Sequence, residues 1–195
     1  MEIVIASQNK DKIKEIKSIL ADPRFTFLST LDYPYCPRVI EDGQTYLENA
    51  LKKARIIAKH TGKIALADDS GLEIPALSNE PGIFSARYAG DHATYDENIH
   101  KVIEKLKNLP GNKSKTAFFK CVIALAHPDG KSDTSEGICE GEIILTPRGT
   151  KGFGYDPIFY VPQFKKTFAE LSQKEKNKIS HRAQALNKIK EKKLF

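Results

Sequence analysis

The sequence is poor in cysteine and contains no long apolar run. Its three cysteines, Cys36, Cys121 and Cys139, are far apart and form no C-x-x-C pair, so neither a zinc site nor a disulfide framework is expected. No apolar stretch approaches the roughly 18 residues of a membrane span. Met1 leads directly into the strand-like segment Glu2–Ala6 without a basic segment and a long apolar stretch, so no secretory signal is expected. We therefore expect a cytoplasmic protein that does not associate with a membrane.

Several common catalytic patterns are also missing. The chain has no nucleophile elbow and no cysteine with a paired base, which argues against a serine hydrolase or a cysteine protease. Metal-binding spacing is absent among four of its histidines, His60, His92, His100 and His127. No repeat, linker or low-complexity segment interrupts the sequence.

The composition is that of an ordinary globular protein with a basic excess. At 195 residues the chain fits one domain, or one domain with two lobes, and 40% of its residues are hydrophobic. A net charge of +6 and a pI near 9.1 raise the possibility of a nucleic-acid-binding domain, which would show steep salt dependence. That alternative is disfavoured because acidic residues (Asp68, Asp69 and Asp156) fall where a polyanion groove should avoid them. An anionic small molecule explains a few lysines equally well.

The periodicity of apolar residues predicts alternating strands and helices. Strands are expected at 2–6, 25–30, 63–67, 116–127, 132–145 and 157–161, the fourth and fifth forming a hairpin. Helices are expected at 13–20, after Thr45 up to Gly62, after Thr94 up to Pro110, and from Ser172 through Ile189. The order βαβαβ, helix, hairpin, strand, helix favours an α/β domain with a mixed sheet.

The first polar segment that could bind a ligand is S-Q-N-K-D-K, from Ser7 to Lys12. It lies between the first strand and the first helix, where free backbone N–H groups and the helix dipole favour an anion. Lys12, one turn into the helix, can reach the same phosphate. A capped helix with a surface lysine is the simpler alternative for this segment taken alone.

The second segment is A-D-D-S-G-L, from Ala67 to Leu72. Successive strand residues point to opposite faces, so one of its two aspartates can face a ligand while the other points away. Mg²⁺ prefers a few carboxylates together with phosphate oxygens and waters, and Glu41 is a plausible second ligand. A strand ending in a polar turn is the alternative. Lys53 lies on the helix expected between Thr45 and Gly62, after the loop that contains Glu41. Lys52 and Arg55 are close to it in sequence, and the spacing does not decide which of the three side chains faces a phosphate.

Two further segments complete the pattern. In G-F-G-Y-D-P (Gly152 to Pro157) a phenylalanine between glycines offers a stacking surface for a base, or else a turn with Phe153 in the core. In S-H-R, predicted to lie inside the last helix, Arg182 presents a fork of donors suited to purine acceptors or phosphate. A surface arginine on a helix face is the alternative.

Together with P-G-I-F-S-A-R-Y-A-G (Pro81 to Gly90), these segments resemble the inosine/xanthosine triphosphate pyrophosphatase family, from Ile3 to about Leu186. The resemblance implies a single domain over residues 1–195. Its α/β fold would have an elongated mixed central sheet, two lobes flanked by helices, and a nucleotide cleft between the lobes. It also implies Mg²⁺ dependence, a homodimer, and a house-cleaning role in nucleotide metabolism with no nucleic-acid partner.

Carried over position by position, the resemblance implies a role for each matching residue. The phosphates would be held by Ser7, Gln8, Asn9, Lys10, Asp11 and Lys12. Asp69 and Lys53 would be catalytic, Asp69 as general base, and Glu41 and Asp69 would bind Mg²⁺. The remaining substrate contacts would come from Ser70, from Phe153, Gly154, Tyr155 and Asp156 around the base, and from Lys176, His181 and Arg182 at the purine edge.

Two positions depart from the family pattern or leave it open. Gln8 stands where many relatives have glycine, so this turn must form without glycine's conformational freedom. Asp42 is adjacent to Glu41, and either could be the second metal ligand.

The implied reaction is attack of water on the α-phosphorus of ITP, dITP or XTP, giving a nucleoside monophosphate and pyrophosphate. Asp69 is expected to titrate below neutrality beside a metal and lysines. A triphosphatase that releases single phosphates, or an enzyme for standard or pyrimidine nucleotides, remains an alternative.

Overall fold

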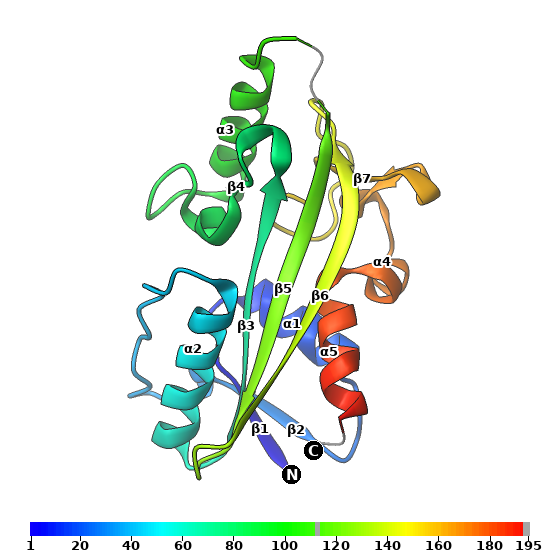
Figure 1. The fold of residues 1–195 in the computed structure, drawn as a ribbon. Coiled ribbons are helices and arrows are strands. Elements are labelled where there is room, and N and C mark those ends of the chain that lie inside the picture. Colours follow the sequence, from blue (N-terminus) through cyan, green and yellow to red (C-terminus); the bar gives the residue numbers. More distant parts are fainter. Residues whose placement is uncertain (112–113, 193–195) are drawn as a thin grey trace. The chain divides into compact units, whose positions relative to one another are not determined.

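The computed structural model describes residues 1–111 and 114–192, so the last three residues of the predicted domain lie outside the described chain. It confirms a mixed α/β fold in which an eight-stranded sheet is flanked by helices (Figure 1). The strand order is β2-β1-β3-β5-β6-β7-β8, and β4 pairs with β3 off this path. Strands β1 and β2 run parallel, as do β1 and β3, whereas β6, β7 and β8 pair antiparallel.

The described chain packs as two compact units. Unit 1 comprises Met1–Asp69, Cys121–Gly137 and the described chain from His181 onward, and unit 2 comprises Ser70–Lys120 and Ile138–Ser180. Three strands contribute residues to both units: β3 (Ile64–Ile74), β5 (Thr116–Ala126) and β6 (Ser132–Ile143).

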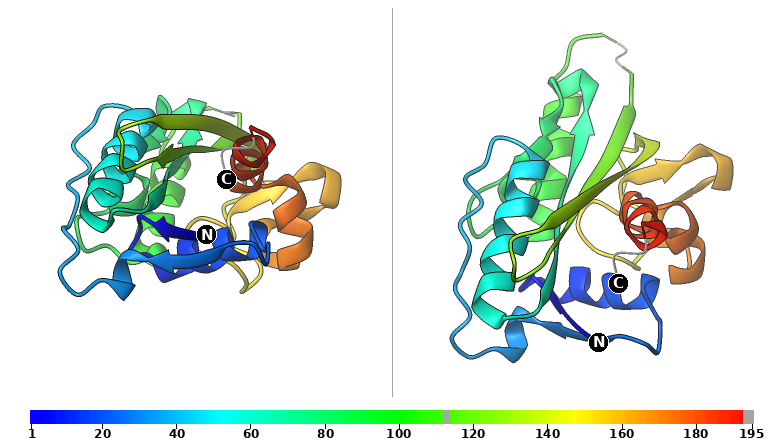
Figure 2. Two further views of the ribbon diagram at one scale, coloured as in Figure 1. Left: turned by 90° about the horizontal axis from the view of Figure 1, so that it is seen from below. Right: turned by 60° about the horizontal axis from the view of Figure 1, so that its bottom comes forward.

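Unit 1 contains three layers. Its other strands are β1 (Glu2–Ile5) and β2 (Thr26–Ser29), and its helices are α1 (Lys10–Ile19), α2 (Tyr46–Thr61) and α5 (His181–Glu191). Helix α2 lies on one side of the strands and helices α1 and α5 lie on the other (Figures 1 and 2).

Strand alternation explains the layers of unit 1. On β1, Ile3 and Ile5 join the apolar cluster of α1 and α5, whereas Val4 joins the cluster of α2. On β3, Leu66 faces the α1 and α5 side and Ala67 faces the α2 side. These strands are apolar on both faces because helices cover both.

Unit 2 has its own apolar core. Its remaining elements are β4 (Glu80–Pro81), α3 (Tyr95–Lys107), β7 (Phe159–Val161), β8 (Lys166–Thr167) and α4 (Gln173–Ile179). Three phenylalanines, Phe119, Phe159 and Phe168, meet in the core with ring centroids 4.5 to 5.7 Å apart. Helix α3 contributes Ile99 and Val102 to the same cluster.

The predicted elements are confirmed with two corrections. Strand β3 does not end before Asp68 but continues to Ile74, because Leu72 and Ile74 are buried in unit 2 and Ile74 pairs with Glu80 of β4. The predicted last helix is two helices, because Ser180 is extended (φ −64°, ψ 149°) between α4 and α5. The short strands β4 and β8 were not predicted. Throughout the described residues, each helix is too short or too polar to span a lipid bilayer.

Candidate active site in unit 1 and aromatic cluster in unit 2

The turn before α1 is held by its own side chains. The Asn9 side chain accepts hydrogen bonds from the backbone N–H groups of Asp11 (2.9 Å) and Lys12 (3.1 Å), and Ser7 Oγ accepts from Asn9 N–H (3.1 Å). Asn9 is thus the N-cap of α1. The prediction of free N–H groups at Ser7 to Asn9 is therefore corrected for Asn9 and for Ser7, whose N–H donates to the carbonyl oxygen of Ile5 at 2.9 Å. Gln8 and Lys10 are exposed beside them.

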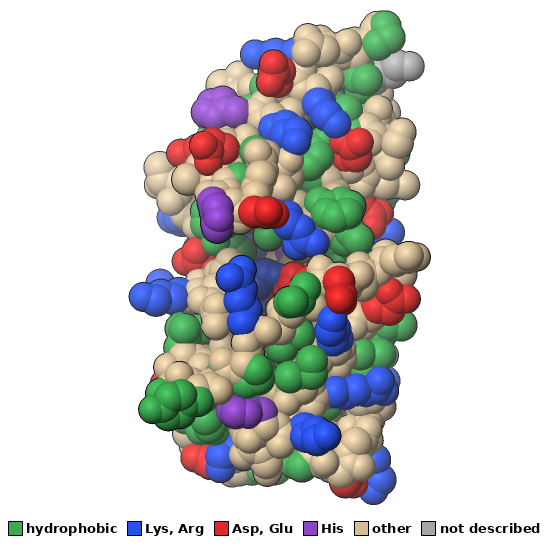
Figure 3. Space-filling view, turned by 90° about the vertical axis from the view of Figure 1, so that its left-hand side faces the viewer, with side chains coloured by type: hydrophobic (Ala, Val, Ile, Leu, Met, Phe, Trp, Pro, Cys, Tyr) green, Lys and Arg blue, Asp and Glu red, His purple; other side chains and the backbone are tan. Residues whose placement is uncertain are grey.

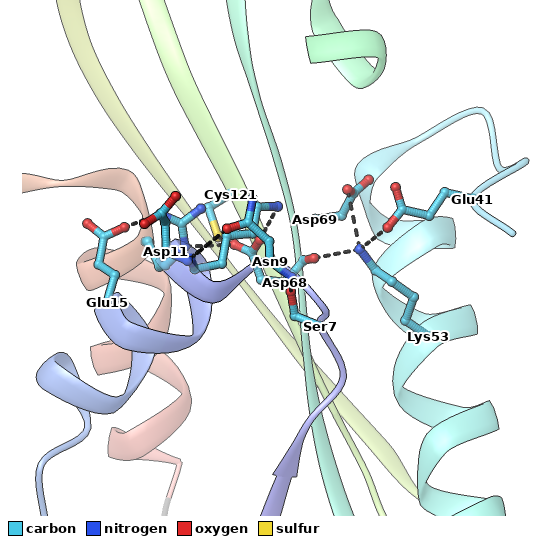
Figure 4. Close-up of polar contacts among 11 residues, drawn as sticks. Ser7, Asn9, Asp11, Glu15, Glu41, Lys53, Asp68, Asp69 and Cys121 are labelled. Carbon is cyan, nitrogen blue, oxygen red and sulfur yellow. Dashed lines mark hydrogen bonds and ion pairs between the residues drawn. The ribbon is translucent and has the colours of Figure 1, made fainter. Parts of the chain in front are cut away.

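Asp68 and Asp69 have different surroundings because they are neighbours on a strand. Asp68 follows Leu66 in the alternation and faces α1 and α5, whereas Asp69 follows Ala67 and faces α2. Figure 4 shows the result, with Cys121 near Asp68, and Lys53 and Glu41 beside Asp69. Both carboxylates are buried.

Asp68 lies in a cluster of three donors. Its Oδ1 lies 2.5 Å from Lys12 Nζ, and its Oδ2 accepts from Arg182 Nε (3.0 Å) and Cys121 Sγ (2.9 Å). Burial alone would raise the pKa of Asp68, but the cations around it, Arg182 first, hold that pKa well below its ordinary value. The pKa of Lys12 is affected in the same way. Burial opposes its positive charge, but the neighbouring Asp68 carboxylate raises the pKa of Lys12 above its ordinary value. Asp68 and Lys12 therefore form a permanently charged pair.

Asp69 shares a lysine with Glu41. Lys53 Nζ lies 2.5 Å from Glu41 Oε1 and 3.6 Å from Asp69 Oδ1, and it donates to the carbonyl oxygen of Asp68 at 2.6 Å. Its neighbour Lys52 instead pairs with the exposed Asp42 at 2.5 Å. Of the lysine and carboxylate alternatives left open by the sequence, the structure therefore brings Lys53 and Glu41 to Asp69.

Asp69 also carries an oxygen that accepts no hydrogen bond from the described residues. This oxygen, Oδ2, is buried, whereas Oδ1 of the same carboxylate lies 3.6 Å from the Lys53 ammonium that Glu41 also contacts. Within the described chain, no group of three or more His, Cys, Asp and Glu side chains is arranged to hold a metal. Two carboxylates still fit Mg²⁺, because that ion commonly takes one or two carboxylates and completes its shell with waters and substrate phosphates.

The ionisation of Asp69 differs from that of Asp68. Burial raises the pKa of Asp69 above its ordinary value, although Lys53 and Lys12 act in the opposite direction. For Glu41, burial also opposes ionisation, but Lys53 prevails and lowers its pKa. Asp69 is thus a stronger base than an exposed aspartate, and Glu41 is a weaker one.

Unit 2 contains a second cluster around Asp156. Its Oδ2 accepts hydrogen bonds from Phe153 N–H (2.9 Å) and from Lys176 Nζ (2.6 Å). The Lys176 ammonium lies 5.1 Å from the centroid of the Phe153 ring, a cation–π contact. Phe153 is half-buried, and Tyr95 tilts against it with the ring centroids 6.0 Å apart. The structure thus brings together three of the residues predicted to hold the base, namely Phe153, Asp156 and Lys176.

The other residues predicted in this segment lie differently. Tyr155 is buried in the core of unit 2 and donates to the carbonyl oxygen of Ser85 at 2.9 Å. Gly154 adopts a positive φ of 61°. Ser70, half-buried, is the first residue of unit 2 on β3.

His181 and Arg182 begin α5 and belong to unit 1. The Arg182 side chain is 2% exposed, and its guanidinium bonds two carboxylates, with NH1 2.5 Å from Glu15 Oε2. His181 is buried as well. Contact of these two side chains with a purine stays a prediction.

Sequence reasoning missed three residues: Glu15, Cys121 and Tyr95. Glu15 lies three residues after Lys12, so both share one face of α1, and this spacing was a usable signal. The contact of Cys121 with Asp68 has no local signal, because the two residues are 53 positions apart. Tyr95, at the start of α3, was hidden in a helix-capping pattern.

The surface bears on the nucleic-acid alternative. On the face drawn in Figure 3, the basic side chains are interspersed with acidic and hydrophobic ones. A groove for a polyanion calls for clustered basic side chains, so this mixture does not favour that alternative.

Comparison with known proteins agrees with the predicted resemblance. The model of the Ham1 family matches residues 3–192. A dITP/XTP pyrophosphatase of Halalkalibacterium halodurans is 50% identical over 188 residues, covering 96% of each chain. One of Desulforamulus reducens is 47% identical over 191 residues, covering 98% of this chain and 94% of the relative. Among solved structures, a HAM1 protein from Coxiella burnetii superimposes with a TM-score of 0.87 at 49% identity, covering 97% of this chain and 96% of that one.

Proposed function

This chain belongs to the Ham1 family, and we propose that it hydrolyses the non-standard purine nucleoside triphosphates dITP, XTP and ITP to a nucleoside monophosphate and pyrophosphate. Relatives that cover nearly the whole chain bear the name dITP/XTP pyrophosphatase, which supports this activity. The observation that carries the proposal is the pair of carboxylates, half-buried Glu41 and buried Asp69, on the single ammonium of Lys53.

In unit 1, Lys12 and Lys53 bind the phosphates. Lys12 is a fixed cation at the start of α1, next to the capped turn of Ser7 to Asn9. Lys53 is held by two carboxylates, so its ammonium is oriented before substrate arrives. Fixed cations of this kind stabilise the negative charge that develops on a departing phosphate group.

Asp69 accepts the proton of the attacking water. Its raised pKa makes it a better proton acceptor than an ordinary aspartate, and its Oδ2 accepts no hydrogen bond within the described chain. The water oxygen bonds to the α-phosphorus, and the bond from that phosphorus to the bridging oxygen breaks. The monophosphate keeps the new oxygen, and pyrophosphate leaves.

Glu41 and Asp69 are the residues that would hold Mg²⁺. When bound there, the ion supplies neutralisation of the triphosphate charge. Asp42 is assigned no part in this site, because it pairs with Lys52 at the surface.

In unit 2, Phe153 stacks on the base. Lys176 and Asp156 fix the backbone and ring of Phe153, and Lys176 is also a donor for the purine edge. Hypoxanthine and xanthine carry an acceptor at position 6, whereas adenine carries a donor. A donor aimed at that position therefore disfavours adenine by about 1–3 kcal/mol.

The activity is tested with a panel of ITP, dITP, XTP, GTP and ATP, assayed with Mg²⁺ for pyrophosphate and orthophosphate separately. We expect pyrophosphate, with the first three nucleotides preferred. Release of orthophosphate alone would replace this proposal with a triphosphatase.

The Asp69→Asn variant tests the assigned base. It should lower kcat at least about 100-fold, the usual contribution of a general base, while circular dichroism remains unchanged. Full activity in a folded Asp69→Asn variant would remove Asp69 from the mechanism.

A homodimer is the assembly implied by the family resemblance. Exposed apolar side chains in unit 1 support it, notably Tyr35 at 90% and Ile40 at 70% exposure. Light scattering of the purified protein measures the assembly mass directly.

A further inference from the structure

A chain of four buried or partly buried charges runs from α5 to α1 in unit 1. In order, its members are Glu15, Arg182, Asp68 and Lys12, and we call it the ion chain. Arg182 NH1 bonds Glu15 Oε2 at 2.5 Å, Arg182 Nε bonds Asp68 Oδ2 at 3.0 Å, and Asp68 Oδ1 meets Lys12 Nζ at 2.5 Å. Figure 4 labels Glu15 and Asp68, the two acids of the ion chain.

The two oxygens of Asp68 are divided between different partners. Oδ2 accepts from Arg182 Nε and from the Cys121 thiol, and Oδ1 lies against Lys12 Nζ. Glu15 Oε2 accepts from NH1 of the same guanidinium, so Arg182 bridges the carboxylates of Glu15 and Asp68. Without Glu15, the fork of Arg182 is free to take both oxygens of Asp68, as arginine commonly does with a carboxylate.

Three of the four charged side chains are buried, so each depends on its partners to offset its charge. The side chains of Glu15, Arg182 and Asp68 are 4%, 2% and 0% exposed, whereas Lys12 is 19% exposed. Two acids and two bases balance each other, and removing one buried partner leaves an uncompensated charge. The ion chain thus leads from the interior of unit 1 to one accessible ammonium.

We propose that Glu15 and Arg182 are positioning residues for phosphate binding, which hold the Lys12 ammonium in place through Asp68. This rests on the proposed function, in which Lys12 binds the substrate phosphates. The role rests on the two carboxylate contacts of Arg182, one to Glu15 and one to Asp68.

The first test is a charge-removing variant, Glu15→Gln. Because Lys12 loses its fixed position, we expect KM to rise roughly tenfold for ITP, XTP and ATP alike, with kcat within about threefold of the parent value. Binding of inorganic pyrophosphate with Mg²⁺, measured by calorimetry, should weaken by a similar factor. Glu2→Gln is the matched control: it removes an acid that pairs with Lys63 at the surface, and all these values should stay unchanged.

A double-mutant cycle separates positioning from mere stability. If Glu15 acts through Lys12, then Glu15→Gln should have little further effect on pyrophosphate binding once Lys12→Gln is present. Additive effects of the two substitutions would overturn the proposal, as would unchanged pyrophosphate binding in a folded Glu15→Gln variant.

Arg182→Lys serves as the second variant should Glu15→Gln fail to fold. It keeps the charge but loses the fork that spans both carboxylates. We expect weaker binding of pyrophosphate, a ligand that carries no base. Unchanged pyrophosphate binding in a folded Arg182→Lys variant would overturn the proposal. Because calorimetry needs no turnover, an inactive parent protein would contradict the proposed function and leave the positioning test intact.

Discussion

Asp68 and Asp69 illustrate how one residue step decides chemistry. The strand turns successive side chains to opposite faces, so Asp68 meets Lys12 and Arg182 while Asp69 meets Lys53. The pKa of Asp68 is consequently held well below its ordinary value and that of Asp69 is raised. Adjacent carboxylates with divergent pKa values suit different roles, and we propose that Asp68 is a permanent anion for positioning and Asp69 a base for proton transfer.

At the same scale, the cluster around Asp156 in unit 2 requires a residue without a side chain at Gly152. Gly152 has a φ of +73°, and a Cβ atom there would lie 1.9 Å from Asp156 Oδ2. That oxygen cannot retreat easily, because Phe153 N–H and Lys176 both bond it. We therefore predict that Gly152→Ala displaces Asp156 and raises KM for ITP roughly tenfold, measured by steady-state kinetics.

Gly111→Ala, in the same unit, is the matched control for that variant. Its φ of +75° gives a similar backbone strain, about 1–2 kcal/mol, but its Cβ would meet no described atom within 4 Å. Both variants should lose thermal stability, and Gly152→Ala should lose more substrate affinity. Equal KM values in the two variants would contradict the role given to Asp156.

At the scale of elements, the contact between β6 and α5 sets where Arg182 lies. Ser135 Oγ on β6 donates to the carbonyl oxygen of Ala185 at 2.7 Å. Nearby, the absence of a side chain at Gly137 lets the strand approach the first turn of the helix, and a Cβ there would lie 2.0 Å from the carbonyl oxygen of His181. Only glycine permits this approach, because the opposing atoms belong to the backbone.

We predict that Gly137→Ala pushes the start of α5 away from β6. Overpacking of this kind costs about 1–3 kcal/mol of unfolding free energy. Because the same turn carries Arg182, KM should rise as well. Denaturant unfolding and kinetics measure both effects.

Gly130→Ala, in the turn between β5 and β6, is the comparison. It has a positive φ of +94° and nothing within 4 Å of the added Cβ, so it should lose stability while KM stays at the parent value. A Gly137→Ala protein with unchanged KM would show that the position of α5 does not control substrate binding.

At the scale of the whole molecule, the two units keep separate cores and titrate differently. Unit 1 holds the balanced ion chain, whereas the core of unit 2 contains neutral ionisable groups, notably Cys139 and Tyr88. Burial raises the pKa of Cys139 from 9.0 to about 12 and, together with a hydrogen bond to Glu80, raises that of Tyr88 to about 12. The folded chain therefore retains protons at alkaline pH that the unfolded chain releases.

The sign of the pH dependence follows from this difference. Between pH 9 and about 12 the folded state binds more protons at Cys139, so the unfolding free energy must fall as the pH rises. The Cys139→Ala variant lacks this pH-dependent contribution to the unfolding free energy. The free-energy cost of the cavity left by the missing thiol does not depend on pH. The stability difference between the parent and Cys139→Ala should shrink across this window by on the order of 3 kcal/mol. A constant difference in denaturant titrations would contradict burial of the thiol.

The sequence predicted most elements because their signals are local. Capping residues marked the starts of α2, α3 and α4, and Gly62 closed α2 in the left-handed conformation. Two elements were predicted wrongly: β3 is longer than predicted, and the predicted last helix is two helices. Asp69-Ser70-Gly71 had the composition of a turn, yet β3 continues through it because the residues beyond are buried and paired in unit 2.

By itself, the sequence determined the strand and helix order, the family, and which segments carry polar chemistry. It also determined that Asp68 and Asp69 would diverge, since alternation is a property of any strand. Only the tertiary structure decided which lysine and which acid meet Asp69, and that Arg182 meets Glu15 across 167 residues of chain. Local patterns report on neighbours within a few residues, whereas these ion pairs depend on how distant helices pack against the same strand.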